Sequence, residues 1–394
     1  MRCVGTVVRG IRTPIIKEKD DLASIVVDSL LKASENEGFK FRDKDVVAIT
    51  EAVVGISEGN YVTVDDIAMD VQNKFPSKNI GIVFPILSRN RFSMILKGIA
   101  RGVDKITMLL SFPSDEVGNA LLDEDVLDES KYNLASVISE KEYKETFGDF
   151  NHPFTGINIV DFYKELIEGE NCKVEFVFAN NPKEILNYTN DVLTCDIHTR
   201  LRTKKILEKE GAHVYGLFEI MNKSINGSGF NPNYGLLGSN KSTEERLKLF
   251  PKTGDKLVNE VQKSLKELTG KTIEVMVYGD GAFKDPVGYI WELADPVVSP
   301  AYTKGLEGTP NEIKLKYISD NKFSDLRGEE LKNAIKNEIK NKDSNLKGNM
   351  LSQGTTPRRI TDLIGSLCDL TSGSGDKGTP VVFIQGYFDN LSDE

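Results

Sequence analysis

Apolar positions in the first 77 residues alternate between helical and strand spacing. The segment 21–33 carries apolar residues three and four positions apart, which predicts an amphipathic helix, and Asp20 can cap its start. The apolar run 45–54 predicts a strand that leads into a glycine-containing loop. Thr63, followed by Asp66 three residues later, predicts a second helix with a capping box.

Strands and helices alternate between residues 78 and 221. Apolar runs predict strands at 80–86, 105–112, 173–179, 192–197 and 213–220. Helical segments lie between them, including 88–101 and 199–210. This order predicts βαβ units, and we interpret the region as one doubly wound, Rossmann-like domain with a parallel sheet. It contains no G-x-G-x-x-G motif, so the sequence does not indicate a dinucleotide site.

The pattern changes again between residues 222 and 394. A long polar stretch at 223–251 is rich in Gly, Asn and Ser, and such stretches inside a compact protein are usually functional or disordered. Beyond it, the spacing predicts helices at 255–268, 325–342 and 357–370. Strands are predicted at 272–278, 313–318 and 380–385. The whole pattern predicts a protein with both α/β and α+β parts.

Length, charge and cysteine content exclude several classes of protein. At about 150 residues per domain, the 394 residues predict two or three domains. The net charge of -10 argues against a non-specific nucleic-acid binder, and no apolar run approaches the roughly 18 residues of a membrane span. The four cysteines form no C-x-x-C pair, and the N-terminus lacks the apolar core of a secretion signal. We therefore expect a cytoplasmic protein with no nucleic-acid or membrane partner.

The first segment with candidate chemistry is 235–242. It nearly matches the phosphate loop G-x-x-x-x-G-K-[ST], but Asn240 replaces the second glycine and no strand precedes it. A second interpretation is that Ser242 has the capping-box pattern of a helix over 243–249. A third is that Ser239, Asn240 and the N-terminus of that helix contact a phosphate.

Acidic residues after the strand 272–278 are candidate metal ligands. Asp280 follows this strand and Asp285 comes five residues later. Mg²⁺ prefers one or two carboxylates together with phosphate oxygens and water, so this spacing fits a metal held against a nucleotide. The alternative is a hairpin turn, which Asp-Gly favours. Farther along, Glu292 and Asp295 lie beside the only tryptophan, in a segment that is also typical of a helix end before proline.

Two segments near the C-terminus add anion and metal candidates. Arg358 and Arg359 follow a Thr-Pro pair that is typical of a helix start, and this pattern fits either an anion site or capping alone. The glycine-rich segment 373–380 lets the backbone approach a ligand, and Asp376 within it can bind a metal or a ribose hydroxyl. A flexible connector is the alternative there.

A separate candidate lies within the region 78–221. Asp196 and His198 end a predicted parallel strand, which is where ligands of α/β domains bind. A structural role for the pair is the alternative. The three histidines of the chain show no metal-ligand spacing.

Several of these segments together resemble the coenzyme F-420 gamma-glutamyl ligase family. The resemblance rests on five segments in the family's order, at 10–22, 45–59, 235–240, 265–280 and 376–386. It covers about 1–77 and 223–394. We therefore predict a ligase-like α+β domain built from 1–77 and 222–394, with 78–221 as an inserted domain.

The resemblance implies an enzyme that uses GTP, or ATP, with Mg²⁺ or Mn²⁺. Such ligases join L-glutamate to a carboxylate acceptor through an acyl phosphate, and family members are homodimers. Of the metal ligands, the resemblance implies Asp280, and we add Asp285 and Asp376 as the candidates that complete the site. The implied nucleotide-binding residues are Ser57, Glu58, Gly59, Ser239, Asn240, Gly375 and Gly378. Further acidic or anion-site contributors are Glu292, Asp295, Arg358 and Arg359.

The chain departs from the family pattern at two metal-ligand positions. Leu237 stands where the family motif has an aspartate, and Ser374 stands where the last glycine-rich loop has an acidic or amide residue. Either other carboxylates complete the metal site, or the metal chemistry has changed. Two other hypotheses stay open: a non-catalytic small-molecule-binding or regulatory protein, and an enzyme whose site lies near Asp196 and His198.

Overall fold

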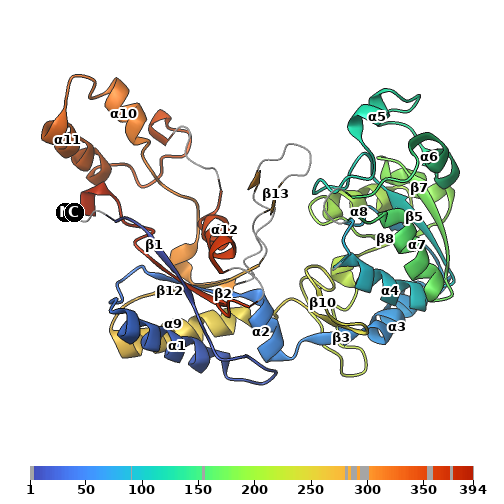
Figure 1. The fold of residues 1–394 in the computed structure, drawn as a ribbon, viewed down its shortest axis with the longest axis horizontal. Coiled ribbons are helices and arrows are strands. Elements are labelled where there is room, and N and C mark those ends of the chain that lie inside the picture. Colours follow the sequence, from blue (N-terminus) through green and yellow to red (C-terminus); the bar gives the residue numbers. More distant parts are fainter. Residues whose placement is uncertain are drawn as a thin grey trace. The chain divides into compact units, whose positions relative to one another are not determined.

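The computed structural model describes residues 4–89, 91–152, 156–279, 283–284, 291–292, 301–352, 358–372 and 376–393. The chain forms two compact units, and it passes from the first to the second and back twice (Figure 1). Unit 1 comprises Met1–Val54, Thr253–Ala282 and Leu293–Glu394, and unit 2 comprises Gly55–Lys252 and Phe283–Glu292. The mixed α/β character is confirmed. The division at residues 77 and 221 into a ligase-like domain and an insert stays a prediction.

Unit 1 is built on a five-stranded sheet to which both ends of the chain contribute. The strand order is β1 (Val7–Ile11), β16 (Val381–Gln385), β2 (Val46–Thr50), β12 (Glu274–Tyr278) and β15 (Ala301–Tyr302). Strands β2 and β12 are parallel, whereas the other pairs are antiparallel. The first strand pairs along its whole length with the last one, from Val7 opposite Gln385 to Ile11 opposite Val381.

Helices cover both faces of this sheet. Successive side chains of a strand point to opposite faces, so β2 sends Val47 toward one core and Ala48 toward the other. Helices α1 (Leu22–Glu37) and α9 (Gly254–Thr269) pack in the first core, and α12 (Ile360–Ser372) packs in the second. Helices α10 (Leu315–Asn321) and α11 (Gly328–Lys340) form a smaller cluster of their own.

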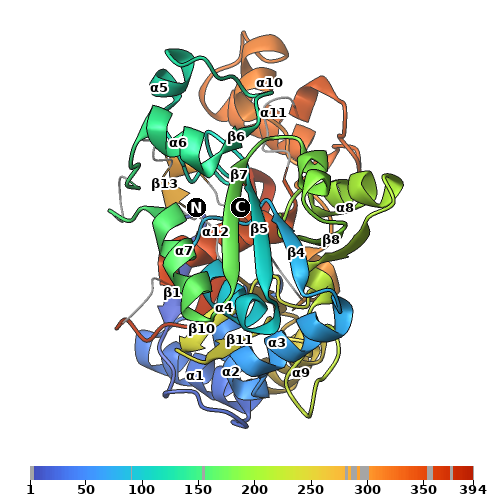
Figure 2. The ribbon, with the colours of Figure 1, turned by 90° about the vertical axis from the view of Figure 1, so that its right-hand side faces the viewer.

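Unit 2 contains the parallel sheet that the region 78–221 predicts. Its order is β6 (Ile138–Ser139), β7 (Lys173–Phe178), β5 (Lys105–Leu110), β4 (Asn79–Val83), β8 (Asp191–Thr194) and β9 (His213–Gly216). All pairs from β7 to β9 are parallel, and only the edge strand β6 is antiparallel. Strands β7, β5 and β4 stand side by side in Figure 2.

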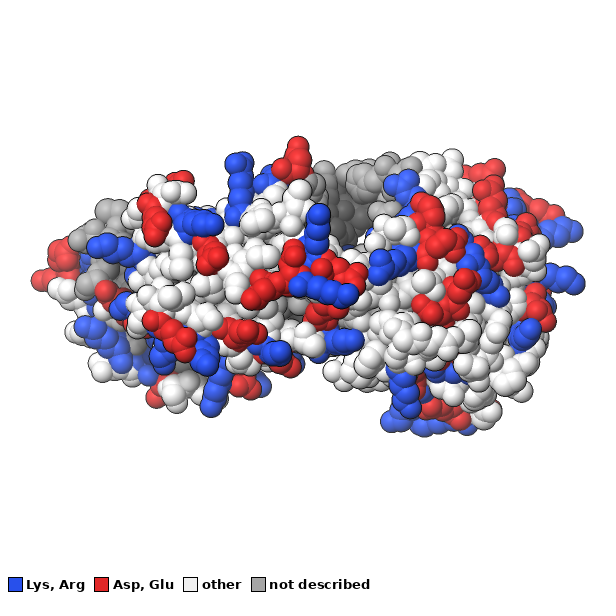
Figure 3. All heavy atoms as spheres, turned by 90° about the horizontal axis from the view of Figure 1, so that it is seen from below, with Lys and Arg blue, Asp and Glu red and all other residues white. Residues whose placement is uncertain are grey.

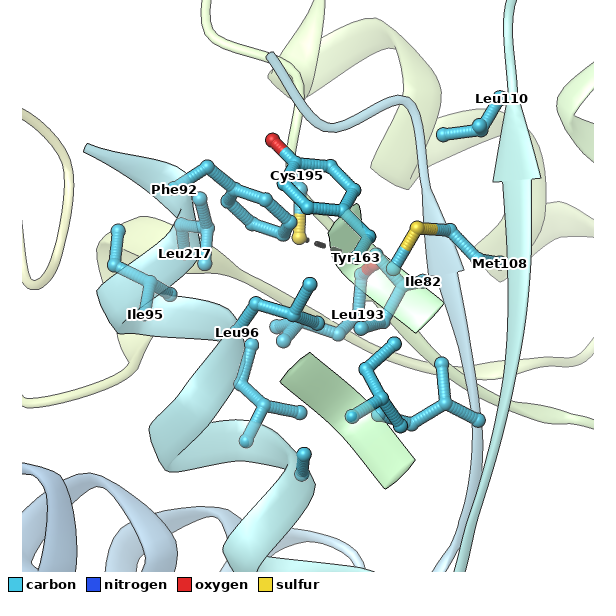
Figure 4. Packing of buried hydrophobic residues seen from close by; sticks show 14 of the residues in the cluster. Ile82, Phe92, Ile95, Leu96, Met108, Leu110, Tyr163, Leu193, Cys195 and Leu217 are labelled. Atoms are coloured by element: carbon cyan, nitrogen blue, oxygen red, sulfur yellow. Dashed lines mark hydrogen bonds between the residues drawn. The ribbon is translucent and has the colours of Figure 1, made fainter. Parts of the chain in front are cut away.

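The parallel sheet is doubly wound, with helical elements in the cores on its two faces. On one side, Ile82 and Met108 pack with α4 (Phe92–Gly102) and α7 (Ile159–Gly169), as Figure 4 shows around Tyr163. On the other side, Val83 packs with the 3₁₀ helix η1 (Pro182–Asn187) and with α8 (Arg200–Lys209).

A second sheet of unit 2 lies at the end of the polar stretch. It consists of β10 (Asn240–Thr243), β11 (Arg246–Lys248) and β3 (Tyr61–Thr63). The helix predicted over 243–249 is therefore wrong. The segment is a hairpin because Arg246, Leu247 and Lys248 pair with β3, a strand far away in the sequence.

Two further local predictions are corrected, and two are confirmed. The strand predicted at 45–54 stops at Thr50, where α2 (Glu51–Glu58) begins. The strand predicted at 313–318 is wrong: its residues 315–318 belong to α10, where Ile318 packs in one buried cluster with Ile335 and Ile339 of α11. The capping box of Thr63 and Asp66 is present at the start of α3 (Val64–Lys74). Helix α1 is present but Asp21, rather than Asp20, caps it through the Ser24 N–H.

The remaining elements are short. They are α5 (Glu124–Asp128), α6 (Glu140–Phe147), β13 (Phe283–Lys284), β14 (Trp291–Glu292), η2 (Leu217–Glu219), η3 (Lys304–Leu306), η4 (Met350–Ser352) and η5 (Leu391–Asp393). Among the helices in the described part of the chain, none has the length and apolar character needed to cross a membrane.

Candidate active site

The polar stretch 223–251 consists of a loop and the hairpin of β10 and β11, and two buried asparagines of unit 2 bond to its backbone. Asn60 donates from Nδ2 to the Phe250 carbonyl at 2.8 Å and accepts from the Phe230 N–H at 3.0 Å. Asn231 donates to the carbonyls of Phe250 and Pro251, both at 3.2 Å. Its Oδ1 accepts two backbone N–H groups of the turn that follows. These bonds satisfy backbone groups that would otherwise be buried without partners.

The two glycines of segment 235–240 are required by this fold. Gly235 and Gly238 have φ angles of +51° and +70°, a region that other residues rarely adopt. A Cβ atom at Gly235 would lie 2.4 Å from the Ile220 carbonyl oxygen, and one at Gly238 would lie 1.4 Å from the Phe250 ring. Backbone conformation and close packing therefore require these glycines, whether or not the segment binds a phosphate.

Leu237 belongs to the hydrophobic core of unit 2. Its side chain is buried within the same cluster as Leu236 and Leu249. A carboxylate in this apolar environment would be costly without a partner. A leucine in place of the family's aspartate at position 237 therefore fits the apolar packing of unit 2.

Ser239 is the residue of this segment that most strongly indicates a ligand. Its side chain is 1% exposed, and its Oγ has no hydrogen-bond partner among the described residues. Buried hydroxyl groups in proteins are nearly always hydrogen-bonded, so an unsatisfied one calls for an explanation such as a bound group. The next residue, Asn240, starts strand β10 and pairs with Lys248.

Lys248 connects this hairpin to helix α2. It is only 7% exposed, which is rare for a lysine. Its aliphatic chain lies against Gly55, where a Cβ would come within 3.2 Å of the Lys248 Cδ. No local pattern predicts the burial of Lys248, because a lysine in an alternating strand normally points to solvent.

Ser57, Glu58 and Gly59 lie at the C-terminal end of α2. Ser57 and Glu58 are helical, and Gly59 follows with a φ of +63°. The Glu58 carboxylate accepts from the Lys252 backbone N–H at 2.9 Å. The C-terminal end of a helix carries a partial negative charge, which favours a cation there rather than a bare phosphate. Within unit 2, the contacts of Lys248 and Lys252 thus bring the segment 57–59 and the hairpin of Asn240 together.

The candidates of unit 1 lie around the two ends of α12. Arg358 and Arg359 precede this helix, whose first N–H, at Ile360, donates to the Gly308 carbonyl at 3.0 Å. Beyond its other end, Asp376 is exposed in a turn and Gly378 has a φ of +66°. A helix of this length measures about 20 Å. The arginines and Asp376 therefore do not meet in one site.

Asp196 and His198, the candidates within the region 78–221, lie in different environments. Asp196 is buried and its Oδ2 accepts from Thr199 and Thr203, whereas His198 is exposed. The neighbouring Cys195 packs in the core of Figure 4 and donates to the Leu193 carbonyl at 3.7 Å. Burial raises the pKa of its thiol well above the usual value, which disfavours the reactive thiolate form.

Several predicted metal ligands lie outside the described residues. These are Asp280, Asp285 and Asp295, together with Gly375 of the nucleotide set and Ser374. Glu292 lies in β14, but its side chain is not described. Across the described ranges, no group of three or more His, Cys, Asp or Glu side chains could hold a metal ion. The metal site stays a prediction.

Charge on the surface is mixed. On the face shown in Figure 3, acidic and basic side chains are interspersed among the described residues. The charge of a candidate site therefore depends on its own lining residues.

Comparison with known proteins gives one family. The model of the family described as F420-0:gamma-glutamyl ligase matches residues 10–386. This match covers the region between residues 78 and 221. It also covers the five segments whose sequence resembles the family. No curated protein matches the chain.

Proposed function

Because this chain belongs to the F420-0:gamma-glutamyl ligase family, we propose that it is a nucleotide- and metal-dependent ligase. Its reaction joins L-glutamate to a small carboxylate acceptor. The observation that supports this proposal best, apart from the family match, is the buried Ser239 hydroxyl within the family-like segment 235–240.

The proposed reaction has two steps. In the first, the γ-phosphoryl group of GTP, or of ATP, passes to a carboxylate oxygen of the acceptor, and a nucleoside diphosphate leaves. In the second, the glutamate nitrogen forms a bond to the acyl carbon, the carbon–oxygen bond to phosphate breaks, and inorganic phosphate and a proton are released. Such phosphoryl transfer depends mostly on positioning and on neutralising the charge of the phosphates.

The residues proposed for nucleotide binding in unit 2 supply donors and one cation. Ser239 Oγ can donate to a phosphate or ribose oxygen, and the Asn240 amide can do the same. Lys248 is close to both through the pairing of β10 with β11. In unit 1, Gly378 leaves room for a close backbone approach. The glycine-rich segment before it includes Gly375.

The proposed metal ligands are Asp280, Asp285 and Asp376. Mg²⁺ or Mn²⁺ bound there would supply positive charge against the phosphate oxygens. Glu292 and Asp295 are further proposed acidic contributors. Arg358 and Arg359, at the other end of α12 from Asp376, are proposed as a separate anion site. A homodimer in the cytoplasm is part of the same proposal.

Calorimetric titration tests the nucleotide requirement. We expect GTP or ATP to bind the full chain only when Mg²⁺ or Mn²⁺ is present. Asp280→Asn should abolish the metal-dependent part, whereas the exposed Asp128→Asn should leave it unchanged. Metal-dependent binding that survives Asp280→Asn would remove Asp280 from the metal site.

Phosphate release tests the reaction itself. With a bound nucleotide, release of inorganic phosphate should require both L-glutamate and a carboxylate acceptor. Nucleotide binding without turnover for any acceptor would support the second candidate, a non-catalytic binding or regulatory protein. The burial of Leu237 at a metal-ligand position of the family favours that candidate.

A further inference from the structure

The parallel sheet of unit 2 has a topological switch point at β4. From β4 the chain continues to β5 on one side, and later strands are added from β8 on the other side. In open α/β sheets, ligands bind at this point, outside the carboxyl ends of the strands. The segments that follow these ends here are 84–89 after β4, 111–122 after β5 and 195–199 after β8.

Several backbone N–H groups of the segment after β8 donate hydrogen bonds to one carboxylate, that of Glu116. Glu116, from the segment after β5, accepts from the N–H of Ile197, from the N–H of His198 at 3.1 Å and from the N–H of Thr199 at 3.4 Å. The Thr199 hydroxyl also lies 3.4 Å from this carboxylate, but it donates its one hydrogen to Asp196, at 2.5 Å. These groups precede helix α8, whose N-terminus attracts anions. Glu116 thus holds the position that the anionic group of a ligand would take.

The charges of α8 strengthen this anion position. The first turn of the helix has two arginines, Arg200 and Arg202, and no acidic residue. Acidic residues are the ones that stabilise a helix N-terminus, so the arginines are unfavourable for the helix itself. His198 and Thr199 are exposed residues, so this end of α8 lies at the surface of unit 2, with Glu116 bonded to its N–H groups.

Beside the anion position lies a buried carboxylate oxygen without a partner. Asp196 is 1% exposed, and its Oδ2 accepts from the hydroxyls of Thr199 at 2.5 Å and Thr203 at 2.6 Å. Its Oδ1 has no hydrogen-bond partner within the described ranges. Burial raises the pKa of Asp196, and the nearby charge of Glu116 raises it further. The two carboxylates are neighbours because the Thr199 hydroxyl contacts both. The unpartnered oxygen of Asp196 is a position for a donor group.

A ligand of this site needs two groups close together. One is an anionic group that accepts from the N–H groups of 197–199, and the other is a cationic donor that faces Asp196 Oδ1. We propose that the switch point of unit 2 binds a free amino acid: its α-carboxylate displaces Glu116 from the N–H groups of 197–199, and its ammonium group donates to Asp196 Oδ1. Glu116 is then an internal competitor that covers the site when no amino acid is bound. This inference goes beyond the proposed ligase reaction, because it concerns binding by residues that take no part in the proposed catalysis.

Glu116→Ala and Asp196→Asn test the proposal, because they should change the affinity for the amino acid in opposite directions. The probes are the twenty standard amino acids, with acetate and inorganic phosphate as anions that lack an ammonium group. Calorimetry and thermal unfolding are measured on the full chain. We expect at least one amino acid to bind about tenfold more tightly to Glu116→Ala, which loses the competing charged hydrogen bonds, and about tenfold more weakly to Asp196→Asn. The exposed Glu124→Ala, on the same unit, should leave the affinity unchanged.

Three results would overturn the proposal. One is that no amino acid binds either the wild type or Glu116→Ala. Another is that acetate or phosphate binds as well as any amino acid and is indifferent to Asp196→Asn, which would indicate an anion site only. The third is that Glu116→Ala weakens amino-acid binding. Should Asp196→Asn fail to fold, the gain in affinity in Glu116→Ala, or in Glu116→Gln, still decides the question. Nucleotide titration of the same variants reports on the ligase proposal separately.

Discussion

Gly98 of α4 lies directly against Ile67 of α3. A Cβ atom at Gly98 would come within 2.7 Å of the Ile67 Cβ. One turn later, a Cβ at Gly102 would come within 2.7 Å of the Ala68 carbonyl oxygen. The two helices therefore approach almost to backbone contact, which joins the segment 64–74 firmly to the parallel sheet of unit 2.

We predict that Gly98→Ala lowers the free energy of unfolding by about 1–3 kcal/mol, because the added methyl group forces the helices apart. Gly169→Ala is the matched control, since it also lies in a helix but has no atom within 4 Å of the added Cβ. That variant should be neutral or raise the free energy of unfolding by up to about 1 kcal/mol. Urea denaturation measures both, and equal effects of the two substitutions would contradict the close packing.

Gly238→Ala should destabilise unit 2 by more than about 2 kcal/mol, because it combines a left-handed φ with a clash against the Phe250 ring. Gly227 has a φ of +84° but open space around it, so Gly227→Ala should show only the backbone strain of about 1 kcal/mol. The difference between the urea midpoints of Gly238→Ala and Gly227→Ala measures the effect of the clash with the Phe250 ring. A Gly238 variant no less stable than the Gly227 variant would show that the loop adapts easily.

Ser239→Ala separates a ligand-binding role from a structural one. The Ser239 hydroxyl is buried and makes no hydrogen bond to the described residues, so its removal should leave the stability of the ligand-free protein unchanged or raise it by up to about 1 kcal/mol. Nucleotide affinity should fall about tenfold, which is about 1.4 kcal/mol. The exposed Ser242→Ala is the control. A loss of stability without a change in nucleotide affinity would exclude Ser239 from the binding site.

The ion pairs of Glu245 predict a pH dependence. Hydrogen bonds from Arg101, and then from Lys97, lower the pKa of Glu245 to about 2. A lowered pKa in the folded state means that the stabilisation is present above the unfolded value of 4.5 and is lost as the pH falls toward 2. Because Glu245 is exposed, Glu245→Gln should lower the free energy of unfolding at neutral pH by no more than about 1 kcal/mol.

The difference between wild type and Glu245→Gln should shrink as the pH is lowered from 5 toward 3, and it should also shrink in high salt. Chemical denaturation at several pH values measures this difference. A difference that stays constant over this range would mean that the carboxylate charge contributes nothing.

Local signals were sufficient for much of the fold. The capping box of Thr63 and Asp66 starts α3 as predicted, since both partners lie within one helical turn. The apolar runs of β4 and β5 form central strands because both faces of the sheet are covered. Alternating strands and helices therefore sufficed to predict the parallel sheet.

Local signals failed where pairing partners are distant. Ser242 and Glu245 have the spacing of a helix start, but the segment is a hairpin because its second strand pairs with Tyr61, Val62 and Thr63. Likewise, the run 45–54 is apolar throughout, and only the sheet decides that the strand stops at Thr50. A propensity that acts over a few residues is weaker than a ladder of hydrogen bonds and a buried face.

Five short segments in one order were enough to indicate the family, and the residue types within them indicated which side chains could carry the chemistry. The packing of unit 2, by contrast, was needed to see that Leu237 is a core residue and that the Ser239 hydroxyl is buried without a partner in the described chain. It also brought the Glu116 carboxylate to the N–H groups of 197–199, about eighty residues away. Burial and contacts between distant segments depend on how strands are ordered in a sheet, and no local pattern of residues encodes that order.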